Sequence, residues 1–279
     1  TTKNLLNEIF SARGETVAPI ASFNNEVGAP LTFLKLTEDT QTLIAEMGAS
    51  APGEIRRLIS MAKPDVGIVL TVGLAHAGEF GGIEVTLTSK TEMVQGLVAG
   101  DTAVLNADDA RVASMADKTD ANVLWFGRGE RADVRASEVS TSLDGTEFTL
   151  HLPEQEPVVV RFNVIGEHHV TNALAAAAAA HTQAVPATEI RDALQRVTRA
   201  EQWRMELQHA GSVHLINDAY NASPDSMAAA LKTIAQIAPS GARTVAVLGA
   251  MSELGDASIE GHDRLGLLAV RLGIDQLIV

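Results

Sequence analysis

The chain has 279 residues, which corresponds to about two domains of ordinary size, and 46% of the residues are hydrophobic. No apolar run approaches the ~18 residues of a membrane-spanning helix, and the formal charge of -14 excludes a duplex nucleic-acid binder or a polybasic membrane binder. The absence of cysteine excludes disulfides, thiolate zinc sites and cysteine nucleophiles, and without a signal peptide or lipidation motif we expect a cytoplasmic protein.

Short apolar runs alternate with amphipathic stretches through the first half of the chain. Residues 1–11 have helical spacing and predict a helix with no strand before it. The expected strands are residues 42–48, 66–72, 103–106 and 122–127, and the expected helices between them are residues 54–63 and 86–98. Strands that alternate with helices of this length predict crossover connections and a parallel sheet buried on both faces. The fold class is therefore predicted as α/β with a doubly wound sheet.

The hydrophobic periodicity changes to two residues between residues 133 and 165, which predicts a β-meander flanking the sheet. The pair Asp144-Gly145 marks one of its turns. The alanine-rich residues 171–184 predict a helix packed closely against a neighbour, and residues 187–197 predict another. We interpret both helices as packing elements.

A second alternating unit follows Arg204. Its expected strands and helices are residues 214–218, 224–237, 244–249, 261–272 and 276–279. We place a domain boundary near residues 200–202, which gives a first domain of residues 1–201 and a second domain of residues 202–279. The second domain is expected to be Rossmann-like and incomplete, because the chain stops on an apolar strand.

Polar residues that follow the predicted strands are the candidates for a functional site, because ligands bind beyond the carboxyl ends of strands in open α/β sheets. Glu46 closes the first run, His76 lies just past the second, and Asn106 and Asp108 follow the third. Each also has a structural interpretation: Glu46 as a carboxylate at a helix N-terminus and His76 as a surface histidine. Lys90, on the helix that follows, would ordinarily be a solvated lysine.

Two polar segments, residues 22–30 and 217–227, could hold a polar ligand. Asn24 and Asn25 in the first segment suit hydrogen bonds to a phosphate or a sugar. Asp218, Tyr220 and Asn221 in the second segment lie at the end of an expected strand. A plain turn explains the first segment equally well. Helix capping by Ser223 and Pro224 explains the second.

Several of these stretches occur together in the order and spacing of one known family. They are FNNEVGAPLT, AEMGAS, AHAGEFGG, SKTEM, LNADD, GEHHVTNALAA, WRMEL, NDAYNASPDSM and GAMSELG, and they extend from near the first residue to about Gly255. The chain therefore resembles the Mur ligases. The first and eighth stretches are similar to those of the branch that adds a D-alanyl-D-alanine dipeptide.

The resemblance implies a metal site and a nucleotide site. Glu46 and His76 match the magnesium-binding pair, and Lys90 matches a lysine that is carbamylated, which would give Mg2+ an oxygen anion as ligand or through water. These three residues are the expected catalytic group. The residues that match ATP-binding positions are Asn172 (adenine), Arg204 (phosphates, through a fork of donors) and Asp218 (closing over the nucleotide).

The resemblance also implies the substrates and the reaction. Asn24 and Asn25 match residues that meet the UDP-linked substrate, and Tyr220, Asn221 and Ser226 lie where the dipeptide side should form. ATP would phosphorylate the free carboxylate of UDP-N-acetylmuramoyl-tripeptide in peptidoglycan synthesis, and the amine of D-alanyl-D-alanine would displace the phosphate. ATP and Mg2+ are the expected cofactors, and we expect a monomer with no nucleic-acid partner.

Three other functions remain open at this point. A sister ligase could add another amino acid, or glutamate to a folate, with the same Glu46, His76, Lys90 and Asp218. A binding-only module descended from a ligase would need no phosphate loop. A divalent-metal phosphohydrolase would also place Glu and His at strand ends, but it would not need Asn172 or a second α/β domain.

Three features depart from the family pattern. His169 stands where many relatives carry asparagine, and Ala250 stands where an aspartate is expected. No GxxxxGK(S/T) phosphate loop occurs in the sequence. We therefore expect a piece of a longer enzyme that lacks the N-terminal domain, the phosphate loop and the end of the C-terminal domain, and that is inactive alone.

Overall fold

The computed structural model describes residues 1–49, 51–73, 82–199 and 201–279, and within them a six-stranded sheet with the order β3-β4-β5-β6-β7-β8 organises the first two thirds of the chain. Its parallel part consists of β3 (Val66–Val69), β4 (Thr102–Asn106), β5 (Asn122–Gly127) and β6 (Val134–Ser142). Its antiparallel part adds β7 (Gly145–His151) and β8 (Val158–Phe162). The predicted meander is confirmed, and it continues the main sheet rather than forming a separate one.

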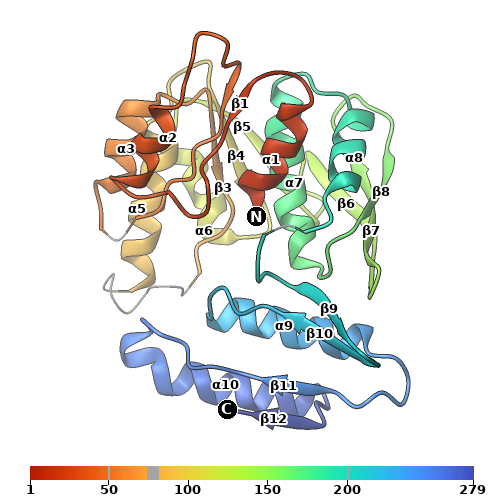
Figure 1. The fold of residues 1–279 in the computed structure, drawn as a ribbon. Coiled ribbons are helices and arrows are strands. Elements are labelled where there is room, and N and C mark those ends of the chain that lie inside the picture. The colour runs from red at the N-terminus through yellow and green to blue at the C-terminus, as the bar shows by residue number, and fades with distance from the viewer. Residues whose placement is uncertain (50, 74–81, 200) are drawn as a thin grey trace.

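Helices cover both faces of this sheet (Figure 1). One face carries α1 (Thr2–Ser11), α7 (His168–Thr182) and α8 (Ala187–Arg196). The other face carries α5 (Ile83–Gln95), α6 (Ala110–Ala113) and the 3-10 helix η1 (Ser114–Lys118). On β4, Val104 packs toward the first set, whereas Ala103 and Leu105 pack toward the second. The doubly wound arrangement is therefore confirmed, since a strand buried on both faces has apolar side chains in succession.

Helix α7 is the most enclosed element of the first unit. Residues 173–178 have no solvent exposure, and the helix contacts α1, α8 and the strands from β3 to β7. Seven of its buried side chains are single methyl groups, so neighbouring backbones can approach closely. The alanine run is thus a packing element, as predicted.

The segment around Glu46 differs from the prediction of a strand in the main sheet. Only β2 (Thr42–Leu43) is extended, and it pairs in parallel with β1 (Thr16–Val17) as a separate two-stranded sheet. The chain then turns, because the Gly48 N–H donates to the Asn24 carbonyl at 2.8 Å instead of to a strand. Between and after these strands lie α2 (Gly28–Phe33) and α3 (Glu54–Ala62).

The second unit begins with a hairpin of β9 (Glu206–Ala210) and β10 (Val213–Asn217), of which only β10 was predicted. Then follow α9 (Pro224–Ile237), β11 (Val245–Val247), η2 (Gly255–Ala257), α10 (Ser258–Arg271) and β12 (Gln276–Ile278), with β11 and β12 in parallel. Its small core consists of Met227, Leu231, Ala246, Met251, Leu254, Leu265 and Ala269. In the described parts of both units, no helix combines the length and apolarity that crossing a membrane requires.

Candidate functional site

The start of α1 lies close to the segment that links the two units (Figure 1). The charges of Glu46, Glu201 and Arg204 all act on the amino group of Thr1, which places these side chains around the first turn of α1. A helix N-terminus has N–H groups without intrahelical partners and a partial positive charge, so it favours anions. The region around the first turn of α1 is therefore the candidate site.

Asn24 and Glu46 are in direct contact. The Asn24 Nδ2 donates to Glu46 Oε1 at 2.9 Å, and a Cβ at Gly48 would lie 3.1 Å from the Asn24 side-chain amide. The neighbouring Asn25 instead accepts the N–H groups of Val27 and Gly28, at 3.2 and 2.8 Å, and so caps the start of α2. The structure thus joins Asn24 to the predicted metal residue and gives Asn25 the turn role that the sequence had left open. Their substrate contacts stay predictions.

Lys90 lies against the segment that follows β3. Its Nζ donates to the Thr71 carbonyl at 2.6 Å, while the Thr71 hydroxyl donates to Asp109 at 2.8 Å. Burial lowers the pKa of Lys90, and the charge of Asp109 only partly opposes this shift. Burial would raise the pKa of Asp109, but hydrogen bonds from Val72, Thr71, Val112 and Arg111 hold it below its usual value. Asp109, which the sequence analysis missed, therefore anchors the Thr71 segment as well as the start of α6.

The other metal-site predictions have different outcomes. His76 lies outside the described residues. Across the part of the chain that the structure describes, no group of three or more His, Cys, Asp or Glu side chains is arranged to hold a metal ion. Asn106 donates to the Leu70 carbonyl and accepts from the Asp108 N–H, and Asp108 accepts from two backbone N–H groups. Asn106 and Asp108 thus connect strand ends through backbone hydrogen bonds.

Asn172 joins the first turns of α1 and α7. Its Oδ1 accepts from the Thr2 hydroxyl at 3.1 Å, and its Nδ2 donates to the His168 carbonyl at 3.3 Å. The side chain is therefore held at the start of α1, next to the region that would hold phosphates. The adenine contact stays a prediction.

Two adjacent histidines at the start of α7 are in contact, and the second of them is buried. The rings of His168 and His169 lie 4.2 Å apart, and His169 is only 2% exposed. Neither ring nitrogen of His169 has a hydrogen-bond partner in the described ranges of the chain. Burial and the charge of Arg204 lower the pKa of His168 to about 4. Because buried polar atoms are normally paired, the unsatisfied nitrogens fit a site that completes its contacts with a ligand.

A buried lysine balances a carboxylate at the same place. Lys3 Nζ lies 3.6 Å from Glu201 and donates to the Pro19 carbonyl, and Asn4 donates to Glu201 at 2.9 Å. Burial would raise the pKa of Glu201, but the charge of Lys3 contributes to holding it below its usual value. These residues were not predicted, because a lysine on an amphipathic helix gives no sign in the sequence that it is buried.

Arg204 and Tyr220 are residues of the second unit that lie at this site. The Arg204 Cζ lies 4.5 Å from the centre of the Tyr220 ring, and the Tyr220 hydroxyl hydrogen-bonds to Ser22 of the first unit. The residues on either side of Arg204 have a left-handed backbone, with φ of 58° at Trp203 and 49° at Met205. This backbone conformation fixes the direction in which the Arg204 side chain extends from the backbone. Ser22 begins the predicted polar segment of residues 22–30, but it was not among the candidate side chains of that segment.

The other predicted site residues of the second unit, Asp218, Asn221 and Ser226, form hydrogen bonds within that unit. Asp218 accepts from the Met205 N–H at 3.1 Å, and burial raises its pKa. Asn221 accepts the N–H of Ala222, and Ser226 forms a capping box with Ser223 at the start of α9. The capping prediction is therefore confirmed. The ligand roles of all three residues stay predictions.

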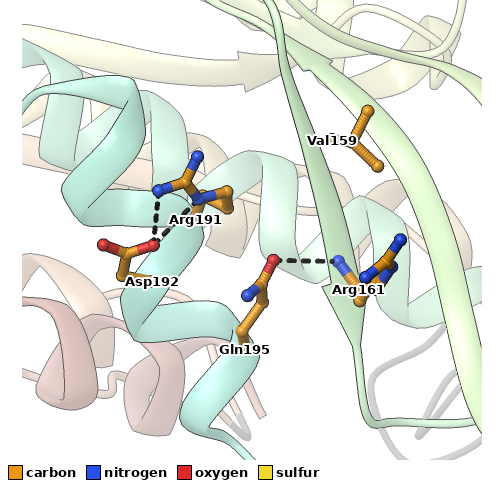
Figure 2. Close-up of a pocket in the computed structure, with 5 residues that line it drawn as sticks. All are labelled: Val159, Arg161, Arg191, Asp192 and Gln195. Carbon is orange, nitrogen blue, oxygen red and sulfur yellow. Dashed lines mark hydrogen bonds and ion pairs between the residues drawn. The ribbon is translucent and has the colours of Figure 1, made fainter.

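An open hollow of about 320 Å³ lies elsewhere, between β8 and α8. Figure 2 shows its five lining residues. Arg191 forms an ion pair with Asp192, and the backbone N–H of Arg161 donates to the Gln195 side chain. Arg161 is also paired with Glu147 at 3.0 Å. Both arginines are thus neutralised, and none of the predicted site residues lines this hollow.

Comparison with known proteins identifies two family regions. Residues 1–180 match the Mur ligase middle domain, and residues 203–279 match the Mur ligase glutamate ligase domain. The chain is 44% identical to the UDP-N-acetylmuramoyl-tripeptide--D-alanyl-D-alanine ligase of Mycobacterium tuberculosis, over 100% of this chain and 56% of that protein. It is 31% identical to the Escherichia coli enzyme of the same name, over 99% of this chain and 61% of that protein.

Solved structures give the same result. MurF from Acinetobacter baumannii matches with a TM-score of 0.93 and 31% identity, over 99% of this chain and 60% of that one. MurF ligase from Thermotoga maritima in complex with ADP matches with a TM-score of 0.88 and 26% identity, over 99% and 62%. The chain spans about 56% of the mycobacterial relative and about 61% of the Escherichia coli relative.

The lowered pKa of His168 predicts that the chain loses stability in acid. Its pKa falls from 6.5 to about 4 on folding, so the unfolded chain binds the proton more tightly. Stability should therefore decrease as the pH falls from about 6.5 to about 4, by up to about 3 kcal/mol from this residue. Urea denaturation at several pH values measures the effect. His168→Asn should reduce the dependence, whereas His214→Asn, at an exposed position, should not; equal slopes in wild type and His168→Asn would contradict the prediction.

Proposed function

The chain belongs to the Mur ligase family, and we propose that it forms the ATP-handling part of an enzyme that adds D-alanyl-D-alanine to UDP-N-acetylmuramoyl-tripeptide. The observation that supports this most is the convergence of Glu46, Lys3 and Arg204 on the first turn of α1. The 44% identity to a ligase of this specificity supports the choice of substrates. The predicted cytoplasmic location, monomeric state and domain boundary near residues 200–202 stay predictions.

The first turn of α1 fits the phosphates of a nucleotide. Its backbone N–H groups and the positive end of its dipole favour negative charge. Arg204 adds a guanidinium that can hold two phosphate oxygens. The unsatisfied His169 ring lies at the start of α7, beside Asn172, where a base or ribose could supply the missing partner. We therefore assign Asn172 and Arg204 to ATP, as the family resemblance implies.

Glu46 and Lys90 are the proposed ligands of a hard cation. Glu46 offers carboxylate oxygen, but Lys90 as an amine is a donor and cannot bind a cation. The lowered pKa of Lys90 increases the share of neutral amine, whose nitrogen can attack CO2 and release a proton to solvent. The product is a carbamate anion with two oxygen atoms. Mg2+ held by Glu46, this carbamate and the predicted His76 would neutralise phosphate charge.

The chemistry then consists mainly of alignment. The tripeptide carboxylate attacks the terminal phosphorus of ATP, a bond to ADP breaks, and an acyl phosphate forms. The amine of D-alanyl-D-alanine attacks the acyl carbon, and the tetrahedral intermediate expels phosphate and loses a proton to give the amide. Arg204 stabilises negative charge, and the first turn of α1 orients the phosphates, so the protein acts by positioning and electrostatics.

Contacts between the units support closure around this site. The Tyr220–Ser22 hydrogen bond lies next to Asn24, whose N–H donates to the Ser22 carbonyl at 2.9 Å. Asn24 in turn holds Glu46. A continuous set of contacts thus joins Arg204 to the proposed metal residue. We propose that this set aligns the two halves of the site when the second unit closes.

The proposed reaction makes phosphate release depend on both substrates. A protein that contains this chain at the length of its curated relatives should release phosphate from ATP only with UDP-N-acetylmuramoyl-tripeptide and D-alanyl-D-alanine together. The 279-residue chain, which has no GxxxxGK(S/T) motif, should release none. A coupled phosphate assay measures both. Release with a different amino acid in place of the dipeptide would indicate a sister ligase, and release from ATP without either substrate would contradict ligation.

The proposed carbamate predicts a specific nuclear magnetic resonance signal. With 13C-labelled bicarbonate, the wild-type chain should show one carbamate carbon that disappears in Lys90→Ala. Lys118→Ala, at an exposed lysine, is the matched control and should keep the signal. A spectrum without the signal in wild type, or with the signal unchanged in Lys90→Ala, would refute the assignment.

The contact between Ser22 and Tyr220 predicts that the two units protect each other. Tyr220→Phe removes the hydroxyl but keeps the ring under Arg204, so backbone amides of residues 22–25 should exchange hydrogen about twofold to tenfold faster, as expected for the loss of one neutral hydrogen bond. Hydrogen-exchange mass spectrometry measures this rate. Ser114→Ala, which removes a hydroxyl bonded within the first unit, should leave these amides unchanged. Unchanged exchange in Tyr220→Phe would show that the contact does not hold the units together.

A further inference from the structure

The hairpin of β9 and β10 carries two histidines that the proposed ligase reaction does not use. His209 and His214 are directly opposite each other in the antiparallel pairing. Their ring centres lie 5.1 Å apart with an interplanar angle of 75°, and both side chains are exposed. Two imidazoles fixed side by side on a strand pair can act as one chelating unit.

The turn of the hairpin places the two side chains on the same face. Only Gly211 and Ser212 separate the paired residues Ala210 and Val213, and Gly211 has the positive φ of 63° that such tight turns need. In a hairpin with a two-residue turn, the pair next to the closing pair is a non-hydrogen-bonded pair. Cα atoms in such pairs are about 4.5 Å apart, closer than in hydrogen-bonded pairs. His209 and His214 occupy this pair.

The spacing of the rings agrees with joint coordination of one metal ion. A metal–nitrogen bond of about 2.0–2.1 Å, added to about 1.2 Å from the nitrogen to the ring centre, puts each ring centre about 3.2 Å from the metal. At a tetrahedral angle, the two ring centres are then about 5.2 Å apart. The observed 5.1 Å is close to this separation.

Little rearrangement is needed to point two nitrogens at the same ion. The line of the Cβ–Cγ bond passes near the centre of an imidazole ring, so rotation about that bond redirects the nitrogens and leaves the centre in place. This torsion has a broad energy profile, and the exposed rings have room to turn. The two-histidine geometry is thus available without moving the backbone.

We propose that His209 and His214 form a binding site for a borderline-soft divalent metal ion, namely Zn2+, Ni2+ or Cu2+. Imidazole nitrogen suits these ions, whereas Mg2+ prefers oxygen ligands. Water molecules complete the coordination, because no third His, Cys, Asp or Glu joins the pair in the described residues. The site is therefore separate in ligand chemistry from the proposed magnesium site at Glu46.

Binding at this pair would clamp the hairpin that connects two predicted ATP residues. Arg204 lies just before β9, Asp218 lies just after β10, and the Met205 N–H donates to Asp218 at the open end. A metal at the turn end would join the strands at a second place. Hydrogen exchange of β9 and β10 should slow in its presence.

Titration of the untagged chain with Zn2+ in a calorimeter tests the proposal. Wild type should bind Zn2+ at this site at least about tenfold more tightly than either His209→Asn or His214→Asn, because the second ligand binds as an intramolecular partner. The control is His181→Asn. His181 lies on α7 and is hydrogen-bonded to Gln155, and this variant should bind Zn2+ as wild type does. An excess of Mg2+ should not compete.

Several results would overturn the site. Equal Zn2+ stoichiometry and affinity in wild type and both variants would do so, as would loss in one variant only. Circular dichroism of the variants checks that the exposed substitutions leave the fold intact.

Discussion

Burial of the alanine-rich part of helix α7, residues 173–180, is the constraint on which the candidate site depends. Its alanine side chains let the sheet, α1 and α8 approach the helix closely, so the first turns of α1 and α7 lie side by side and share the Thr2–Asn172 hydrogen bond. Larger side chains on α7 would displace α1, because protein interiors have little free volume. The geometry of the candidate site around the first turns of α1 and α7 is therefore a consequence of packing in the core.

The proposed binding of anionic ligands by an acidic protein is consistent with a field that is local. The chain has a formal charge of -14, yet the start of α1 and Arg204 bring positive charge to this place, where Glu201 balances the charge of Lys3. Helix dipoles act over about the first turn, and exposed charges beyond about 8–10 Å are screened by salt. The net charge therefore bears on the binding of large charged partners such as nucleic acids, and it says little about the binding of a small anion at this site.

The sequence could predict most of the fold because periodicity reports burial. Helix α9 and strand β5 have the expected bounds, and the helices around them differ by a few residues at most. The main errors are the strand around Glu46 and the unpredicted β9. The former fails because a run with apolar residues does not reveal that a neighbouring Asn24 will take the backbone hydrogen bond.

The site was predictable only through its motifs. Family resemblance pointed to Asn24 and Glu46, which are in contact, and to Lys90, whose amine is partly buried. Ser22 and Tyr220 are 198 positions apart, and neither has a local pattern that implies their contact. The contacts of Glu201 with Lys3 and Asn4 could not be predicted for the same reason. Residues that act across the chain leave no periodic signal, since their partners are set by tertiary structure.

The left-handed residues on both sides of Arg204 have a consequence for the entropy of ligand binding. Trp203 and Met205 hold a backbone conformation that non-glycine residues seldom adopt, and Met205 is 3% exposed. The loss of conformational freedom around Arg204 therefore accompanies folding and not the arrival of an anion. Less entropy remains to be lost on binding, so a single guanidinium at this place can contribute more to affinity than an equally charged residue on a mobile loop.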